Sequence, residues 1–185
     1  KQRLKNNVDS TAKDISITLE NGETEILDQQ WLNNIVAEAC SNLSDVKPSP
    51  ILTDTLNNLF NGVKRIDIFQ ALVMSARALV EQEPNYSYVA ARLLLHTIYE
   101  QGLTHFNINY DWEKITSSYQ DYFPKYISKG IEYELLSPSL TDFDLNKLSQ
   151  AIKPERDNQF TYLGLQTLFD RYFIHYQDCR IELPQ

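Results

Sequence analysis

The sequence has few cysteines, few glycines and no long apolar run. Its two cysteines, Cys40 and Cys179, lack C-x-x-C spacing and no signal peptide opens the chain, so we expect reduced thiols in a cytoplasmic protein. The five scattered glycines match neither G-x-x-x-x-G-K-[ST] nor G-x-G-x-x-G, which excludes a glycine-rich phosphate loop. No apolar segment approaches the roughly 20 residues of a membrane helix, so no membrane contact is expected.

Basic charge and metal ligands are also scarce. The chain has 17 Lys and Arg against 25 Asp and Glu, a net charge of -8, which argues against a nucleic-acid partner. His96, His105 and His175 are isolated, without a second ligand at metal spacing, so no metal site is predicted. No nucleophile stands beside a base, and the acidic pairs lie on polar stretches, so we predict no catalytic residue in this chain.

What the chain does contain is typical of a folded, mainly helical protein of one or two domains: 185 residues, 42% of them hydrophobic, with eleven tyrosines. Residues 1–13 are polar and weakly patterned, which predicts a flexible tail. Residues 15–19 then alternate apolar and polar side chains, and Asn21-Gly22 leads into residues 23–27. This pattern predicts a β-hairpin with a type I′ turn, the only strongly indicated β structure.

Apolar residues at helical spacing predict helices through the rest of the chain. Asp28 is expected to cap the first of them, whose buried stripe runs from Trp31 to Leu43. The other predicted helices before residue 103 are 51–60, 67–83 and 86–101, with Gly102 ending the last. After a loop at 103–111 we predict a helix at 112–119, one from about Pro124 to Gly130, an amphipathic turn set at 143–152, and one buried helix over 154–173 with Asp157 and Asn158 at its cap.

The stretch 154–173, PERDNQFTYLGLQTLFDRYF, resembles a segment of the large (alpha) subunit of class I ribonucleotide reductases that reads R-D-x-x-F-x-Y-x-G-x-x-x-L-x-x-R-Y. In that family the segment closes the N-terminal helical region before the catalytic barrel. The resemblance therefore implies that the matching residues pack on a barrel. They are Arg156, Asp157, Phe160, Tyr162, Gly164, Leu168, Arg171 and Tyr172.

The order of hairpin and helices before residue 103 resembles the ATP cone, the regulatory nucleotide-binding module of many such subunits, and Ala90 to Leu93 match its A-A-R-L. Cones that bind nucleotide carry V-x-K-R-D-G at the hairpin and a further Lys on the first helix. This chain has Leu19-Glu20-Asn21-Gly22 and Trp31 at those places. Because Glu20 reverses the charge that a triphosphate needs, the resemblance implies a degenerate cone in which ATP or dATP binding is doubtful.

The resemblance thus implies a mainly α fold: a flexible tail at 1–13, a degenerate ATP-cone-like domain at 14–102, and an N-terminal helical domain at 103–185 that caps the reductase barrel. It implies the N-terminal portion of a ribonucleoside-diphosphate reductase large subunit, an enzyme of deoxyribonucleotide synthesis whose catalytic cysteines lie elsewhere. The implied partners are the remainder of that subunit and the small radical-generating subunit. Two alternatives stay open: an ATP- or dATP-sensing module, and an unrelated helical scaffold that docks a protein through Phe169, Tyr172 and Phe173.

Overall fold

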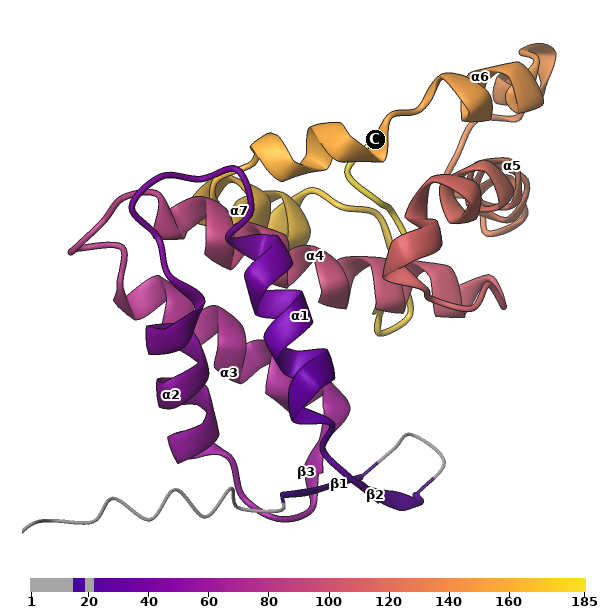
Figure 1. Ribbon diagram of the computed structural model, residues 1–185. Coiled ribbons are helices and arrows are strands. Elements are labelled where there is room, and N and C mark those ends of the chain that lie inside the picture. Colours follow the sequence, from indigo (N-terminus) through magenta and orange to yellow (C-terminus); the bar gives the residue numbers. More distant parts are fainter. Residues whose placement is uncertain (1–14, 19–21) are drawn as a thin grey trace, which may run out of the picture.

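The computed structural model describes residues 15–18 and 22–185 (Figure 1). The predicted tail at 1–13 and the turn residues Leu19, Glu20 and Asn21 lie outside the described residues. Within the described part the chain is mainly helical with a few short strands, which confirms the predicted fold class. No helix of this part combines the length and the apolar character needed to cross a bilayer.

A small sheet lies at one end of the molecule. Strands β1 (Ser16–Thr18) and β2 (Thr24–Ile26) are antiparallel, which confirms the predicted hairpin, and Gly22 has a φ of 84° in the left-handed region that such turns favour. A third strand, β3 (Val63–Lys64), pairs in parallel with β1 and was not predicted. It has only two residues, too few for an alternating pattern to be recognised.

Three helices pack above this sheet. In α1 (Gln29–Ala39) the carboxylate of Asp28 accepts hydrogen bonds from two backbone N–H groups of the first turn, as predicted. Helix α2 (Pro48–Asn58) begins three residues earlier than predicted because proline suits the first turn of a helix. Helix α3 (Arg65–Ala78) ends before the predicted residue 83, since residues after Leu79 form turns leading into Pro84.

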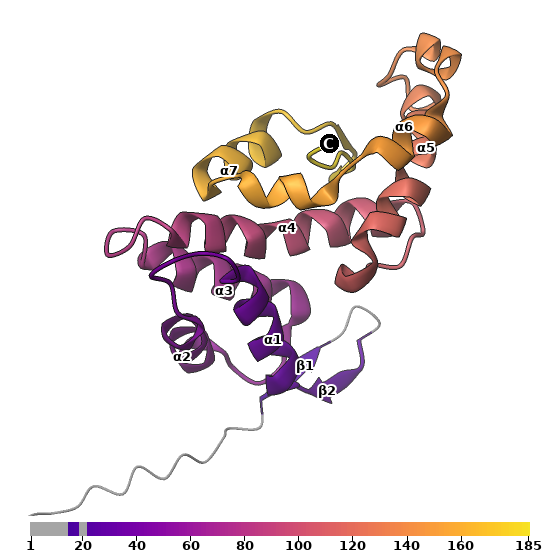
Figure 2. The ribbon, with the colours of Figure 1, turned by 45° about the horizontal axis from the view of Figure 1, so that its top comes forward.

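The central element is α4 (Tyr86–His105), whose side chains are mostly buried. Figures 1 and 2 show α1 and α3 on one side of it and α7 on the other. The prediction that Gly102 ends this helix was wrong: Gly102 is buried within it, and a Cβ there would lie 2.7 Å from Cδ2 of Leu183. The predicted domain boundary at 102/103 therefore falls inside a helix that both predicted domains share.

Residues 115–132 form one helix where two were predicted. After the short 3-10 helix η1 (Trp112–Lys114), helix α5 (Ile115–Glu132) continues through Pro124 and also through Gly130. The chain turns back after α5, and Leu136 then packs on Gly130, where a Cβ would lie 2.5 Å from its Cδ1; the glycine gives room to this side chain. The 3-10 helix η2 (Pro138–Asp142) and α6 (Leu145–Ala151) follow, and with α5 they project from the rest of the molecule (Figure 2).

The chain returns to α4 through the 3-10 helix η3 (Pro154–Gln159), helix α7 (Tyr162–Arg171) and a short hairpin of β4 (His175–Tyr176) and β5 (Cys179–Arg180). This hairpin was not predicted, because its turn is Gln177-Asp178, with Gln177 at a φ of 54°, in place of the usual Asn-Gly signal. Ile181 and Leu183 belong to the same core as Ile15 and Ile17, so one hydrophobic core joins the two ends of the described chain.

Candidate packing face on residues 154 to 185

The stretch 154–173 is not one buried helix, and that prediction was wrong. The 3-10 helix η3 ends at Gln159, Phe160 and Thr161 are extended, and α7 then begins at Tyr162. Leu165 is the one fully buried residue of α7. Asp157 lies in η3, before this break, with its side chain buried.

Asp157 joins three parts of the chain. It is 1% exposed, and its Oδ2 accepts hydrogen bonds from the hydroxyls of Tyr99 in α4, at 2.5 Å, and Tyr119 in α5, at 2.8 Å. Its Oδ1 accepts a third, at 2.7 Å, from Nε2 of Gln185. Burial raises the pKa of Asp157, and the three donors oppose that shift. Burial and the neighbouring charged groups also raise the pKa values of the two tyrosines.

This geometry corrects two predictions about Asp157. It does not cap α7, whose first turn has no side-chain cap from Thr161. Nor is its side chain available to an outside body, because its carboxylate is satisfied within this chain. Sequence reasoning also missed Tyr99 and Tyr119, which resemble ordinary core tyrosines until the fold brings their hydroxyls to one carboxylate.

The other seven residues predicted to pack on a barrel lie nearer the surface. Leu163, which the match does not include, is 74% exposed, and Tyr172 is 70% exposed. The exposed residues of α7 are Leu163, Gly164, Asp170 and Arg171, and Tyr172 follows directly after the helix; we call these five residues the outward side of α7. By burial, Phe160, Tyr162 and Leu168 are half-buried, whereas Arg156, Gly164, Arg171 and Tyr172 are exposed.

Gly164 is unexplained by the chain's own packing. A Cβ at this position would meet only the Oγ1 of Thr161, at 3.5 Å, which is ordinary contact. Glycine inside a helix costs about 0.5–1 kcal/mol relative to alanine. The described residues therefore give no packing reason for glycine at this exposed helical position.

The far end of α7 is fixed by Arg180, which sequence reasoning also missed. Its Nε and one terminal nitrogen donate hydrogen bonds to the backbone oxygens of Phe169, at 2.6 Å, and Asp170, at 2.7 Å. These are carbonyls of the last turn, where a cation also complements the helix dipole. Tyr122 donates a 2.6 Å hydrogen bond to the backbone oxygen of Ile181 and holds the following segment on α5. The outward side of α7 is thus presented on a firmly held support.

The hairpin side of the molecule was the predicted place of a degenerate nucleotide site. A cavity of about 300 Å³ there is lined by Glu25, Asp28, Trp31 and Arg65, among others. Arg65 lies over the Trp31 ring, 5.0 Å from its centroid, and its Nε is 3.9 Å from Oε1 of Glu100. Among the described residues lining this cavity, one cation faces two carboxylates, a poor match for a triphosphate.

Nearby, His96 is buried between two rings, with centroids 5.2 Å from Phe69 and 4.2 Å from Trp112, and its Nδ1 is 2.5 Å from the hydroxyl of Tyr110. Burial, aided by the charge of Arg65, lowers the pKa of His96 to about 3, so the ring is neutral at pH 7. In the described part of the chain, no group of three or more His, Cys, Asp or Glu is arranged to hold a metal ion.

Comparison with known proteins gives a consistent set of relatives, although no protein-family model matches the chain. The ribonucleoside-diphosphate reductase subunit alpha of Chlamydia trachomatis is 36% identical over 172 residues, which is 92% of this chain and 16% of that protein. The subunit of the same name from Chlamydia muridarum is 39% identical over 89% of this chain and 16% of its own length. That of Helicobacter pylori is 33% identical over 92% of this chain and 21% of its own length.

The chain therefore spans about a sixth to a fifth of the relatives that it matches, while nearly all of its own length is covered. The match lies in the N-terminal portion of those subunits, which confirms the resemblance to the reductase large subunit drawn from the sequence. This chain belongs to the ribonucleoside-diphosphate reductase alpha-subunit family, as its N-terminal portion.

Proposed function

We propose that this chain is the non-catalytic N-terminal portion of a ribonucleoside-diphosphate reductase alpha subunit, and that the outward side of α7 packs on the catalytic barrel supplied by the rest of that subunit. The observation that carries the proposal is the exposure of Leu163 (74%) on α7 and of Tyr172 (70%) directly after it, while α7 packs on α4.

Packing on a partner would remove these exposed apolar side chains from water, which is favourable. Covering a fully exposed leucine side chain contributes about 1.5–3 kcal/mol, and a tyrosine buries a large apolar ring while its hydroxyl can reach a partner. Gly164 lies beside Leu163 on the same helix, and the absence of a side chain there allows another backbone to approach closely. Asp170 and Arg171, both exposed, add one charge of each sign just before Tyr172.

In this proposal the chain contributes position and support to the reaction. Its two cysteines are Cys40, which is buried and whose pKa is raised to about 11 by burial, and Cys179, whose pKa burial also raises. Thiols with raised pKa values are poor nucleophiles. The reduction of ribonucleoside diphosphates therefore takes place on the remainder of the subunit, with the small radical-generating subunit as a second partner and the cytoplasm as its compartment.

The proposal includes loss of nucleotide binding by the cone-like part, because one arginine faces two carboxylates beside the Trp31 ring. We expect calorimetric titration with ATP or dATP at millimolar concentration to give no binding heat. A saturable binding isotherm would contradict this part of the proposal and favour the nucleotide-sensing alternative.

The experiment for the main proposal is complementation. The chain is mixed with the remaining part of the alpha subunit and the radical-generating subunit, and reduction of a ribonucleoside diphosphate is assayed. We expect activity in the mixture and none when the chain is omitted. No activity under conditions in which the intact enzyme works, together with no association of the two polypeptides, would contradict the proposal and favour an unrelated scaffold.

A further inference from the structure

A cavity of about 600 Å³ opens between the end of α4 and the middle of α5, away from the outward side of α7. Its apolar lining comes from Phe106, Pro124 and Tyr133. Phe106 is buried, and the Tyr133 ring stacks on Tyr176 with centroids 3.7 Å apart and planes 7° apart. Two of the lining rings are therefore held in place by their packing, and the volume is within the range of small-molecule sites.

The charged residues that line this cavity are both basic. Lys125 and Lys129 lie one turn apart on α5, with Ser128 beside them, so the helix contributes two basic residues and a serine to the lining. None of the lining residues is an aspartate or glutamate, although the chain as a whole carries a net charge of -8. The positive charge of this lining is therefore a local feature, opposite in sign to the net charge of the chain.

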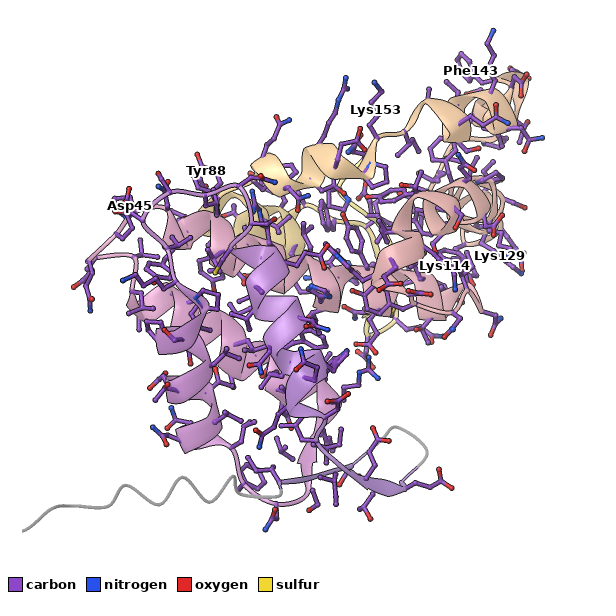
Figure 3. All side chains as sticks on the ribbon, in the orientation of Figure 1. Asp45, Tyr88, Lys114, Lys129, Phe143 and Lys153 are labelled. Atoms are coloured by element: carbon purple, nitrogen blue, oxygen red, sulfur yellow. The ribbon has the colours of Figure 1, made fainter. Side chains whose placement is uncertain are left out.

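The two lysines are accessible to a ligand. Within the described part of the chain, Lys125 takes part in no salt bridge. Lys129 lies 2.7 Å from Oε2 of Glu132, but the two side chains are 47% and 61% exposed, so solvent competes for this pair. Figure 3 labels Lys129 on α5.

The remaining polar groups are neutral. Burial lowers the pKa of His105, so its ring is uncharged at pH 7, and its Nε2 lies 3.3 Å from the hydroxyl of Tyr133. Asn107, at a φ of 55°, follows the C-cap of α4 and adds an amide to the lining. The cavity thus combines two aromatic rings and a proline, two basic residues and neutral hydrogen-bonding groups.

We propose that this cavity is a binding site for a small organic anion, a flat apolar body that carries a phosphate or carboxylate group. The flat body lies against Phe106, Pro124 and Tyr133, and the anionic group lies between the ammonium groups of Lys125 and Lys129. The inference goes beyond the proposed function and does not depend on it, since the cavity is formed by this chain alone.

The test uses three probes that share one ring: phenyl phosphate, benzoate and benzylammonium. Each is titrated into the isotopically labelled chain, and backbone amide resonances are followed by NMR. We expect saturable shifts at the end of α4 and on α5 near Lys125 with one or both anions, and none with the cation. The anion that binds more tightly identifies the group that the site prefers. Equal shifts with the cation, or no saturable shift with either anion, would overturn the proposal.

A pair of double variants tests the role of charge. Lys125→Gln with Lys129→Gln removes both cations of the cavity, and Lys47→Gln with Lys147→Gln removes two exposed lysines elsewhere at the same net charge. We expect about tenfold weaker anion binding in the first variant and unchanged binding in the second, with unchanged thermal unfolding in both. Equal loss in the two variants would show a general charge effect and overturn the site, as would undiminished binding in the first.

Discussion

The hydroxyl of Tyr99 donates a 2.5 Å hydrogen bond to Oδ2 of Asp157, and this contact joins the central helix α4 to the segment that leads into α7. Tyr119 donates to the same oxygen from α5. A buried carboxylate thus fixes the meeting point of three elements that are distant in sequence. The direction in which α7 leaves this point determines which of its side chains face outward.

Removing one donor should weaken the junction. We expect Tyr99→Phe to lower the free energy of unfolding by about 1–2 kcal/mol, because a buried acceptor loses one of its three partners. Urea denaturation measures the change, with Tyr88→Phe as a control, since the Tyr88 hydroxyl makes no hydrogen bond in the described part of the chain. Equal stability of the two variants would show that the bond to Asp157 contributes little.

The ionisation of Asp157 should appear in the pH dependence of stability. Burial raises its pKa above the ordinary value of 3.8, so the folded chain holds this proton more tightly than the unfolded chain. Its contribution to stability is then greatest below pH 3.8 and is lost as the pH rises through the folded pKa. We expect the free energy of unfolding of the natural chain, minus that of Asp157→Asn, to fall over this range. A difference that rises with pH would contradict the assignment.

The titration of His96 should change the free energy of unfolding with pH in the direction opposite to that of Asp157. Its folded pKa of about 3 lies below the ordinary 6.5, so the unfolded chain binds the additional proton between these values. Stability is therefore lost as the pH falls from 6.5 towards 3, with a slope of up to about 1.4 kcal/mol per pH unit from this group. In urea titrations at several pH values, His96→Gln should show a smaller slope in this window. An unchanged slope would mean that His96 is accessible to protons in the folded chain.

Replacing each of two helical glycines by alanine should change the stability of the chain in opposite directions. At Gly102 a Cβ would lie 2.7 Å from the buried Leu183 side chain, so we expect Gly102→Ala to destabilise by about 1–2 kcal/mol despite the better helix propensity of alanine. Gly164→Ala has room and should stabilise the isolated chain by about 0.5–1 kcal/mol. Thermal unfolding of both variants measures this, and stabilisation by Gly102→Ala would contradict the packing described.

Local signals predicted the elements that depend on neighbouring residues. Alternation found the hairpin of β1 and β2, and the Asp28 carboxylate caps α1 as expected. Helix ends predicted from glycine and proline were wrong where tertiary packing determines why these residues are present. Gly102 and Gly130 were expected to end helices, but each gives room to a leucine that arrives from later in the chain.

The candidate face was predicted only in part for the same reason. The spaced match from Arg156 to Tyr172 identified the segment, yet it could not separate Asp157, which is buried, from Tyr172, which is exposed. That separation depends on the hydroxyls of Tyr99 and Tyr119, which the fold alone brings to the carboxylate. It also left out Leu163, the most exposed of the large apolar residues on α7.

The most direct measurement is the affinity of this chain for the remaining part of the alpha subunit, determined by calorimetry. The natural chain is compared with Leu163→Asp, on the outward side of α7, and with Phe60→Asp, which changes an equally prominent residue, 66% exposed, near the sheet. The account predicts a saturable isotherm for the natural chain, at least tenfold weaker binding for Leu163→Asp, and binding by Phe60→Asp like that of the natural chain. Undiminished binding by Leu163→Asp would contradict the claim that α7 contacts the enzyme body.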